Sequence, residues 1–366
     1  MRSRPFSQGG PVAGQVRFGA VRAHHVAEVR HDLDALDEPG FWTVVGDFEG
    51  RLTAVRMEHV ERDVRDQPST DHAALELRSD DLSSWTTSLD RTAYCAAVED
   101  VRQRIARGEV YQVNVCRVLS RLVPQCFSIS DLGDALVAGN PAPYGALIEL
   151  PEAGLAIACA SPELYLARDG SRLESRPIKG TAGTAGSMLV KDTTENVMIT
   201  DLVRNDLSRV SEPGTVSVDA LCAPEDHPGL SHLVSTVSSR LRSDVSWAEV
   251  WAATFPPGSV SGAPKSTALQ AIRDLETMDR GPYCGAIGYV DNDFGVARLA
   301  VGIRTFWLER AAEETVLKFG TGAGITWGSD PLGEWEETEL KARRLVSIAE
   351  SVLRRQTPAR HDGHRT

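Results

Sequence analysis

Residues 176–181 read RPIKGT and place one lysine between a rigid proline and a glycine turn. Pro177 fixes its own φ and favours an extended conformation in the residue before it, so a strand should lead into the motif. Gly180 lets the backbone approach a ligand closely, and Thr181 adds a hydroxyl group. Most lysines in such loops are solvated. Lys179 would act as a nucleophile only if desolvation or a nearby positive charge kept its amine neutral.

Apolar and alternating segments on both sides of this motif predict many short strands, and 3.6-residue periodicity predicts helices between groups of strands. We expect strands at Phe41–Met57 (two, around a turn), Tyr111–Leu122, Tyr144–Leu150, Leu155–Ala160, Leu164–Ala167, Thr215–Val218, His232–Arg240, Gly285–Val290, Ala297–Trp307 and Thr315–Phe319. We expect helices at Arg91–Arg107, Lys191–Arg209, Ser246–Thr254, from Ala263 onward and at Gly333–Arg354. Grouped strands favour a layered α+β fold over a strictly alternating parallel sheet.

Length and composition limit the class of protein. The 366 residues allow two domains or one large one, and 42% hydrophobic with 25% charged residues is ordinary for a protein with a sizeable core. The net charge of −12, from 51 acidic and 39 basic residues, argues against a nucleic-acid partner. The six cysteines include no C-x-x-C pair, which argues against a disulfide framework or a zinc site and favours reduced thiols and a cytoplasmic enzyme.

The sequence carries no signal for export or for a membrane span, and its two ends are rich in residues typical of loose termini. The N-terminus lacks the apolar core of a secretory signal, and no run of about 18 apolar residues predicts a membrane span. We expect residues 1–15 and 356–366 to be disordered, and a shortened N-terminal region, 16–89, to pack on a catalytic unit formed by residues 90–355.

Two pairs of acidic residues stand at helical i, i+3 spacing on the side of their helices that otherwise looks inward. Asp192 and Glu195 form one pair, and Glu334 and Glu337 form the other. Acids in a first helical turn can simply be solvated and favour the helix dipole. Two such pairs in one acidic chain suggest instead a site for a hard cation, because Mg²⁺ takes one or two carboxylates and leaves positions for an anionic substrate.

Three further features carry weaker signals. Residues 320–324, GTGAG, follow a strand, and successive glycine-rich amides can form a concavity for a carboxylate. Arg304 falls inside the apolar segment Leu299–Phe306, where it would form either a buried ion pair or a clamp for a substrate carboxylate. His232 enters a β-branched strand, and taken alone it is most often a satisfied core histidine.

The motifs occur in an order that identifies a family. They are GEVYQVN (108–114), SPE (161–163), PIKGT (177–181), ENVMITDLVRND (195–206), HLVS (232–235), GSVSGAPK (258–265), GAIGY (285–289), IRT (303–305) and GAG (322–324). Over residues 90 to 355 the chain resembles the chorismate-utilising enzymes, and most closely the synthase subunits (component I) of aminodeoxychorismate synthases. The resemblance implies one large unit with an anthranilate-synthase-like α+β fold, in which orthogonally packed antiparallel sheets are flanked by helices in four layers, αββα.

The resemblance also implies a set of site residues. Lys179 corresponds to a lysine that attacks ring C2 of chorismate as the C4 hydroxyl leaves, and Glu163 to the acid/base that helps the hydroxyl depart. Glu195 and Glu337 correspond to the Mg²⁺ ligands, supported by Asp192 and Glu334. The substrate-binding residues would be Gln112, Gly180, Thr181, His232, Ser259, Tyr283, Arg304, Gly322, Ala323 and Gly324.

The expected reaction adds ammonia at C4 and expels the lysine, giving 4-amino-4-deoxychorismate, a precursor of para-aminobenzoate and folate. A separate glutamine amidotransferase (component II) would supply the ammonia, since no glutaminase signature is visible. The alternatives are an anthranilate synthase, which usually carries alanine in place of Lys179, and an isochorismate or salicylate synthase, which carries a water-activating lysine in place of Gln112. A chorismate-binding subunit without activity is a further alternative.

Overall fold

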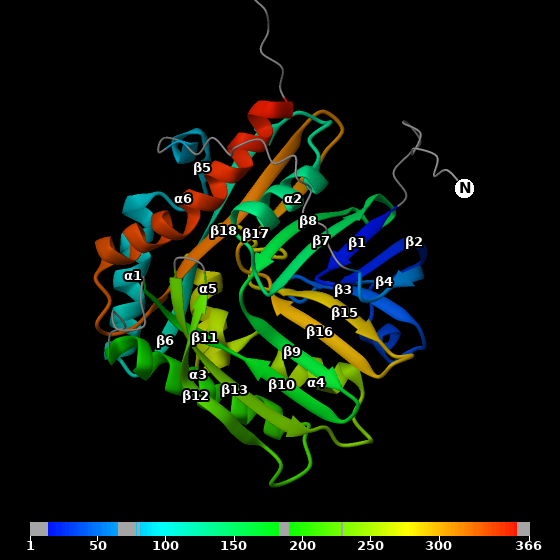
Figure 1. Cartoon of the computed structure of the whole chain (residues 1–366). Coiled ribbons are helices and arrows are strands. Elements are labelled where there is room, and N and C mark those ends of the chain that lie inside the picture. Colours follow the sequence, from blue (N-terminus) through cyan, green and yellow to red (C-terminus); the bar gives the residue numbers. More distant parts are fainter. Residues whose placement is uncertain (1–13, 65–77, 79–80, 183–189, 228–229, 357–366) are drawn as a thin grey trace, which may run out of the picture.

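The computed structural model of the chain describes residues 14–64, 78, 81–182, 190–227 and 230–356 (Figure 1). The segments expected to be disordered at the two ends lie almost entirely outside the described residues. The described strands are β1 (Gln15–Phe18), β2 (Val21–Arg30), β3 (Phe41–Gly46), β4 (Leu52–Glu61), β5 (Thr86–Thr87), β6 (Gln112–Val123), β7 (Tyr144–Leu150), β8 (Leu155–Ser161), β9 (Leu164–Asp169), β10 (Arg172–Arg176), β11 (Ile178–Ala182), β12 (Ser217–His227), β13 (Leu230–Arg240), β14 (Gly262–Ala263), β15 (Ala286–Asp291), β16 (Val296–Val301), β17 (Thr305–Arg310) and β18 (Thr315–Ile325). The described α-helices are α1 (Arg91–Ala106), α2 (Ile129–Gly139), α3 (Val190–Ser208), α4 (Trp247–Thr254), α5 (Lys265–Leu275) and α6 (Pro331–Gln356).

The strands form one continuous antiparallel ladder that folds back over itself. Its order is β5–β6–β18–β17–β8–β7–β1–β2–β4–β3–β15–β16–β9–β10–β13, with β11 and β12 both on β13 and the short β14 on β6. Strands from the beginning of the chain thus link the two halves of the ladder, so the N-terminal region is part of the same sheet as the rest.

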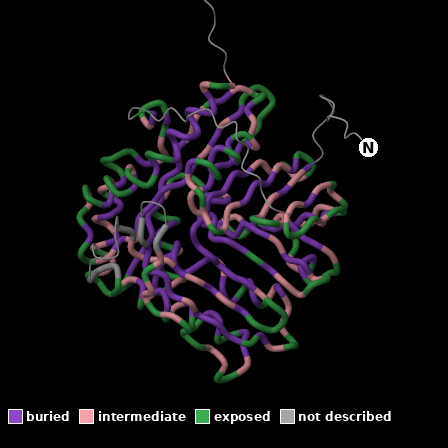
Figure 2. The backbone as a smooth tube through the Cα atoms, in the orientation of Figure 1, coloured by how far each residue is buried: buried purple, intermediate pink, exposed green. Residues whose placement is uncertain are grey.

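Two apolar clusters show how the layers pack. Helices α2 and α6 cover the outer face of the half-sheet that contains β6, β17 and β18, where Leu132, Phe306 and Ile348 are buried together. The larger cluster lies on the other face of that half-sheet and reaches α3 and α4, with Val113, Ile199 and Trp251 among its members. Figure 2 shows buried backbone along the strands and exposed backbone at the rim. The layered α+β fold with flanking helices is therefore confirmed.

Most predicted elements are confirmed at nearly their expected bounds, and every predicted helix begins within two residues of its expected start. The prediction of one strand was wrong. The segment Ala297–Trp307, expected as a single strand, is divided between β16 and β17 by residues 302–304. A Cβ on Gly302 would lie 2.1 Å from the carbonyl oxygen of Pro282, so the close approach of that loop requires glycine and ends the strand. The strand expected to lead into the lysine motif is β10, which ends at Arg176. The prediction missed β1, β2, β5, β11, β14 and α2.

Candidate active site

Lys179 lies in β11, at a point where the pairing with β13 shifts register. The irregularity falls at Gly180, whose φ of +76° is in the region that favours glycine. The Lys179 side chain is half-buried and its Nζ donates a hydrogen bond to the main-chain oxygen of Ser259 at 2.7 Å. Burial lowers the pKa of Lys179 below its usual value, which favours the neutral amine that a nucleophile needs.

Glu163 lies between β8 and β9 and is only 4% exposed. Burial raises the pKa of its carboxyl to about 7, and hydrogen bonds from the Ser259 hydroxyl and the Ile178 amide, together with the charge of Lys179, oppose that rise. Ile178 directly precedes Lys179, so the acid and the amine are held by adjacent residues. A carboxyl group that titrates near neutral pH can donate a proton to a leaving group under physiological conditions.

The environment of Lys179 brings together charges from three parts of the fold. The carboxylates of Glu195 on α3, Glu163 beside β9 and Glu337 on α6 raise the pKa of Lys179, whereas the ammonium of Lys341 lowers it. Residues far apart in the sequence, including one member of each predicted acid pair, therefore act electrostatically on a single amine.

Helix α6 carries the second acid pair on its first turns. Glu334 is buried, whereas Glu337 is about half exposed and forms an ion pair with Lys341 at 2.6 Å. Lys341 Nζ also donates to the main-chain oxygen of Gly322 at 3.0 Å. Sequence reasoning missed Lys341, although its i, i+4 spacing from Glu337 was a visible signal. The side chain of Asp192 lies outside the described residues.

The donor set suits a hard divalent cation. Glu195 on α3 and Glu337 on α6 offer carboxylate oxygens from two different helices, and the charges of both act on the pKa of Lys179. Carboxylate oxygens are the ligands that Mg²⁺ prefers, so the donor types are those of a magnesium site. In this structure Lys341 supplies the positive charge next to Glu337.

Gln112 and Gly324 complete the wall next to Lys179. Gln112, at the start of β6, is 1% exposed, and its side-chain oxygen has no hydrogen-bond partner within the described structure. A Cβ on Gly324 would lie 2.3 Å from the Gln112 Nε2 and 3.6 Å from the Lys179 Nζ. Any larger residue at position 324 would collide with the Gln112 amide beside Lys179. The unpaired amide oxygen of Gln112 can accept a hydrogen bond from an N–H of a ligand.

The glycine-rich segment, expected to follow a strand, is itself part of that strand. Residues 320–324 belong to β18 and pair with β6, with Gly322 opposite Cys116. Pairing of β18 with β17 stops at Phe319, so the second edge of the segment is free of β17. Because Lys341 reaches the Gly322 oxygen from outside the β6 ladder, the amide of the same residue should face that edge too. A paired strand with one open edge can still present alternate amides to a carboxylate.

Arg304 lies in the break between β16 and β17 with a φ of +53°, outside the strand in which it was expected. It is half-buried, and desolvation lowers the pKa of its guanidinium. No acidic side chain among the described residues pairs with it, which removes the structural ion pair as an explanation. A buried, uncompensated arginine is costly unless an anion binds it. The arrangement therefore favours recognition of a carboxylate.

Two other predicted residues are buried beside this region. The ring of Tyr283 packs against Gly320, where a Cβ would come within 2.0 Å of it, and its hydroxyl lies 3.9 Å from the sulfur of Cys116. His232 is 2% exposed in β13, opposite Thr181 in the register. The side chain of Thr181 lies outside the described residues. Tyr283 thus packs against β18, and His232 lies opposite the strand that carries Lys179.

Buried polar contacts hold the site in place. The guanidinium of Arg280 donates to the main-chain oxygens of Val260 and Asn114 at 2.8 and 2.7 Å, which ties the loop that carries Ser259 to β6. On the other side of this loop, Lys265 forms an ion pair with Asp206 of α3 at 2.7 Å. Sequence reasoning assigned no role to these residues. Their effect is to fix the Ser259 oxygen that receives the Lys179 amine.

A small cavity of about 20 Å³ adjoins the acid. Glu163 and Ser259 line one part of it, and Thr254 and Asp206 line another. This volume has room for about one water molecule and is far too small for a ring substrate. The cavity therefore belongs to the surroundings of Glu163 and is not the substrate pocket.

Comparisons with known proteins identify the family of the chain. The model of the chorismate binding enzyme family matches residues 4–347. A protein named anthranilate synthase component 1 from Haloarcula marismortui is 39% identical over 75% of this chain and 57% of its own length. One named aminodeoxychorismate synthase component 1 from Klebsiella aerogenes is 34% identical over 74% of this chain and 60% of its own length. The chain thus spans less than two thirds of these relatives.

Solved structures support the fold. A structure described as a putative 2,3-dihydroxybenzoate-specific isochorismate synthase from Bacillus anthracis superposes with a TM-score of 0.75, at 20% identity, over 93% of this chain and 98% of the other. At that identity the likeness concerns architecture alone. It agrees with the expected antiparallel sheets flanked by helices.

Proposed function

The chain belongs to the chorismate-binding enzyme family, and on that premise we propose that it makes 4-amino-4-deoxychorismate from chorismate and ammonia, with Lys179 as a covalent nucleophile. The observation that carries the proposal is the pairing of a lysine whose pKa is lowered by burial with a buried glutamate whose pKa is raised to about 7. A neutral amine beside a protonated acid is the combination that substitution of a hydroxyl group requires.

The proposed steps balance in atoms and charge. The neutral Lys179 amine forms a bond to ring C2, the two conjugated ring double bonds shift to C1=C6 and C4=C5, and the C4–O bond breaks. Glu163 gives its proton to the departing hydroxyl, which leaves as water. Ammonia then forms a bond to C4, and the reverse shift releases the Lys179 amine, while one proton returns to Glu163. The enolpyruvyl group stays on the product.

We propose that Arg304 and the backbone amides along the edge of β18 that is not paired with β17 bind the two oxygens of one carboxylate. The arginine has no acidic partner among the described residues, and β18 beyond Phe319 is not paired with β17, so its backbone can be reached along that edge. Gln112 would face the incoming ammonia. Glutamine cannot act as a base toward water, which disfavours an isochorismate synthase, whereas ammonia needs an acceptor and no base.

Anthranilate synthesis is the second candidate, because relatives at similar identity carry that name. It differs in outcome: ammonia would enter at C2 and pyruvate would be released. The presence of an amine at position 179, desolvated and next to an acid, favours the C4 product.

We also propose that Glu195 and Glu337 hold Mg²⁺. Such an ion supplies electron withdrawal at the ring carboxylate of the substrate. For the chain's own residues, the consequence concerns Lys179. The charges of both glutamates hold a proton on its amine, so a cation that compensates them favours the neutral form.

The metal proposal predicts that Glu337→Gln raises the Mg²⁺ concentration needed for half-maximal activity by at least about 10-fold, since an amide is a poorer ligand than a carboxylate. Glu336→Gln, an exposed neighbour on the same helix, is the control and should leave it unchanged. Activity should vanish in a chelator and return with Mg²⁺. Full turnover in excess EDTA would contradict the assignment.

The product experiment decides between the two reactions. The purified chain is incubated with chorismate, ammonium and Mg²⁺, and products are identified by mass spectrometry together with a pyruvate assay. We expect an amine that retains the enolpyruvyl group and no pyruvate. Equal amounts of pyruvate and anthranilate would refute the C4 reaction and support the second candidate.

We further propose that ammonia comes from a partner glutamine amidotransferase, in line with the component 1 names of the relatives, and that the product leads to para-aminobenzoate and folate in the cytoplasm. Glutamine should then support turnover only when that partner is present. Among the described helices, none is both long and apolar enough to cross a membrane.

A further inference from the structure

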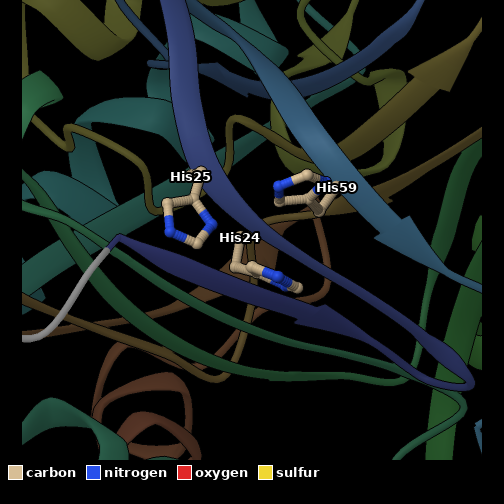
Figure 3. Close-up of side chains that lie close together, drawn as sticks. All are labelled: His24, His25 and His59. Carbon is tan, nitrogen blue, oxygen red and sulfur yellow. The ribbon is translucent and has the colours of Figure 1, made fainter.

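Three histidines gather on the N-terminal strands, away from the carboxylate site. His24 and His25 lie on β2 and His59 on β4, and His24 is directly opposite His59 in the antiparallel register. Each has a ring nitrogen within 4.8 Å of the others, and the ring centroids are 4.9 to 5.2 Å apart. Figure 3 shows the three imidazoles grouped around a common space. His24 is half-buried and the other two are exposed.

The backbone at His25 makes this convergence possible. Consecutive residues of a regular strand point to opposite faces, so His24 and His25 could not both meet His59 on one face. His25 instead has a φ of +62°, in the left-handed region that non-glycine residues adopt at a cost. Its amide still bonds to the oxygen of Gly14 at 3.2 Å. The distortion therefore redirects one side chain while the strand stays paired.

We propose that His24, His25 and His59 bind one zinc ion, which cross-links β2 and β4. Neutral imidazoles suit Zn²⁺ and not Mg²⁺, which selects oxygen ligands, so this site is chemically distinct from the carboxylate pair. Zn–N bonds of about 2.0–2.1 Å in a tetrahedron place ligand nitrogens about 3.4 Å apart. Side-chain rotations at the two exposed histidines close the remaining distance, and water takes the fourth position.

The site lies outside what cysteine spacing could reveal. The sequence argument against zinc rested on the absence of C-x-x-C pairs, and two of these ligands are adjacent in the chain while the third is 34 positions further on. Only the cross-strand register and the positive φ of His25 bring the set together.

The proposal is tested by titrating the full-length protein with Zn²⁺ by calorimetry, in excess Mg²⁺ so that carboxylate sites are occupied. Co²⁺ is then substituted to record the visible absorption of a tetrahedral site. Wild type should bind one ion at this site. His59→Gln and His24→Gln should each weaken binding at least about 10-fold. His31→Gln is the matched control, because His31 is an exposed histidine directly after β2 whose ring contacts the Leu52 oxygen.

His25→Gly is the sharpest variant, because glycine accepts the positive φ and removes only the imidazole. Its metal-free melting temperature should equal or exceed that of wild type, whereas its Zn²⁺ affinity should fall at least about 10-fold and its melting temperature should no longer rise with Zn²⁺. Zn²⁺ affinity unchanged in His25→Gly and His59→Gln, or no binding that these variants affect, would overturn the proposal.

Discussion

Replacement of Lys179 by alanine is expected to lower formation of the C4 amine on the order of 10³-fold or more, as when an enzyme loses its covalent nucleophile. The amine is half-buried, bonded to the Ser259 oxygen, and surrounded by the charges of Glu163, Glu195 and Glu337. No other described lysine shares this environment. Lys179→Arg should fail equally, since a guanidinium stays protonated and cannot attack.

The covalent step gives this prediction a second readout. Intact-mass measurement of the wild type with chorismate but without ammonia should show an adduct equal to chorismate minus water, located at residue 179 by peptide mapping. The control is Lys318→Ala. Lys318 lies on β18 and forms an ion pair with Glu309 of β17, so its loss should leave both the adduct and the activity intact. Undiminished C4 amine from Lys179→Ala would refute the mechanism.

Local sequence predicted those parts of the site that depend on local structure. Pro177 predicted a strand that leads into the lysine motif, and β10 ends at Arg176 directly before it. Gly180 predicted a turn, and the pairing of β11 with β13 shifts register there. The acid pairs were predicted on helices, and Glu195 and Glu337 do lie on α3 and α6 with their charges acting on one lysine. Periodicity sees such patterns because they repeat within a single element.

Contacts between distant elements could not be read in that way. The break between β16 and β17 that contains Arg304 exists because the Pro282 carbonyl approaches Gly302, 20 positions away in the chain. The surrounding run of apolar residues gives no sign of this break in the sequence. Arg280 appears as an ordinary charged residue until it is found buried against the backbone of β6. The glycines of residues 320–324 were expected beyond the end of a strand, whereas they lie within β18 and make room for Tyr283 and Gln112. Each case depends on tertiary packing, which overrides local propensity.

Glu163→Gln is expected to lower kcat by about 10²- to 10⁴-fold, the usual contribution of a general acid, because an amide cannot protonate the leaving hydroxyl. The pH profile identifies the cause. A plot of wild-type kcat against pH should be bell-shaped, since turnover needs a protonated Glu163 and a neutral Lys179 at the same time. Loss of the Glu163 proton produces the alkaline limb, so Glu163→Gln should lose that limb and keep the acid limb. Glu174→Gln, on the exposed side of β10, should retain the full bell.

Glu163→Gln should also make the fold more stable at alkaline pH. The folded-state pKa of Glu163, raised by burial from 4.5 to about 7, means that its contribution to stability is complete below about pH 4.5 and is lost as pH rises through 7. That shift corresponds to about 3 kcal/mol of unfolding free energy above pH 7. Glutamine carries no such penalty, so denaturant unfolding at pH 8 should find the inactive variant more stable than wild type, with the difference vanishing near pH 4. Equal stability at both pH values would mean that Glu163 is solvated and is not the acid.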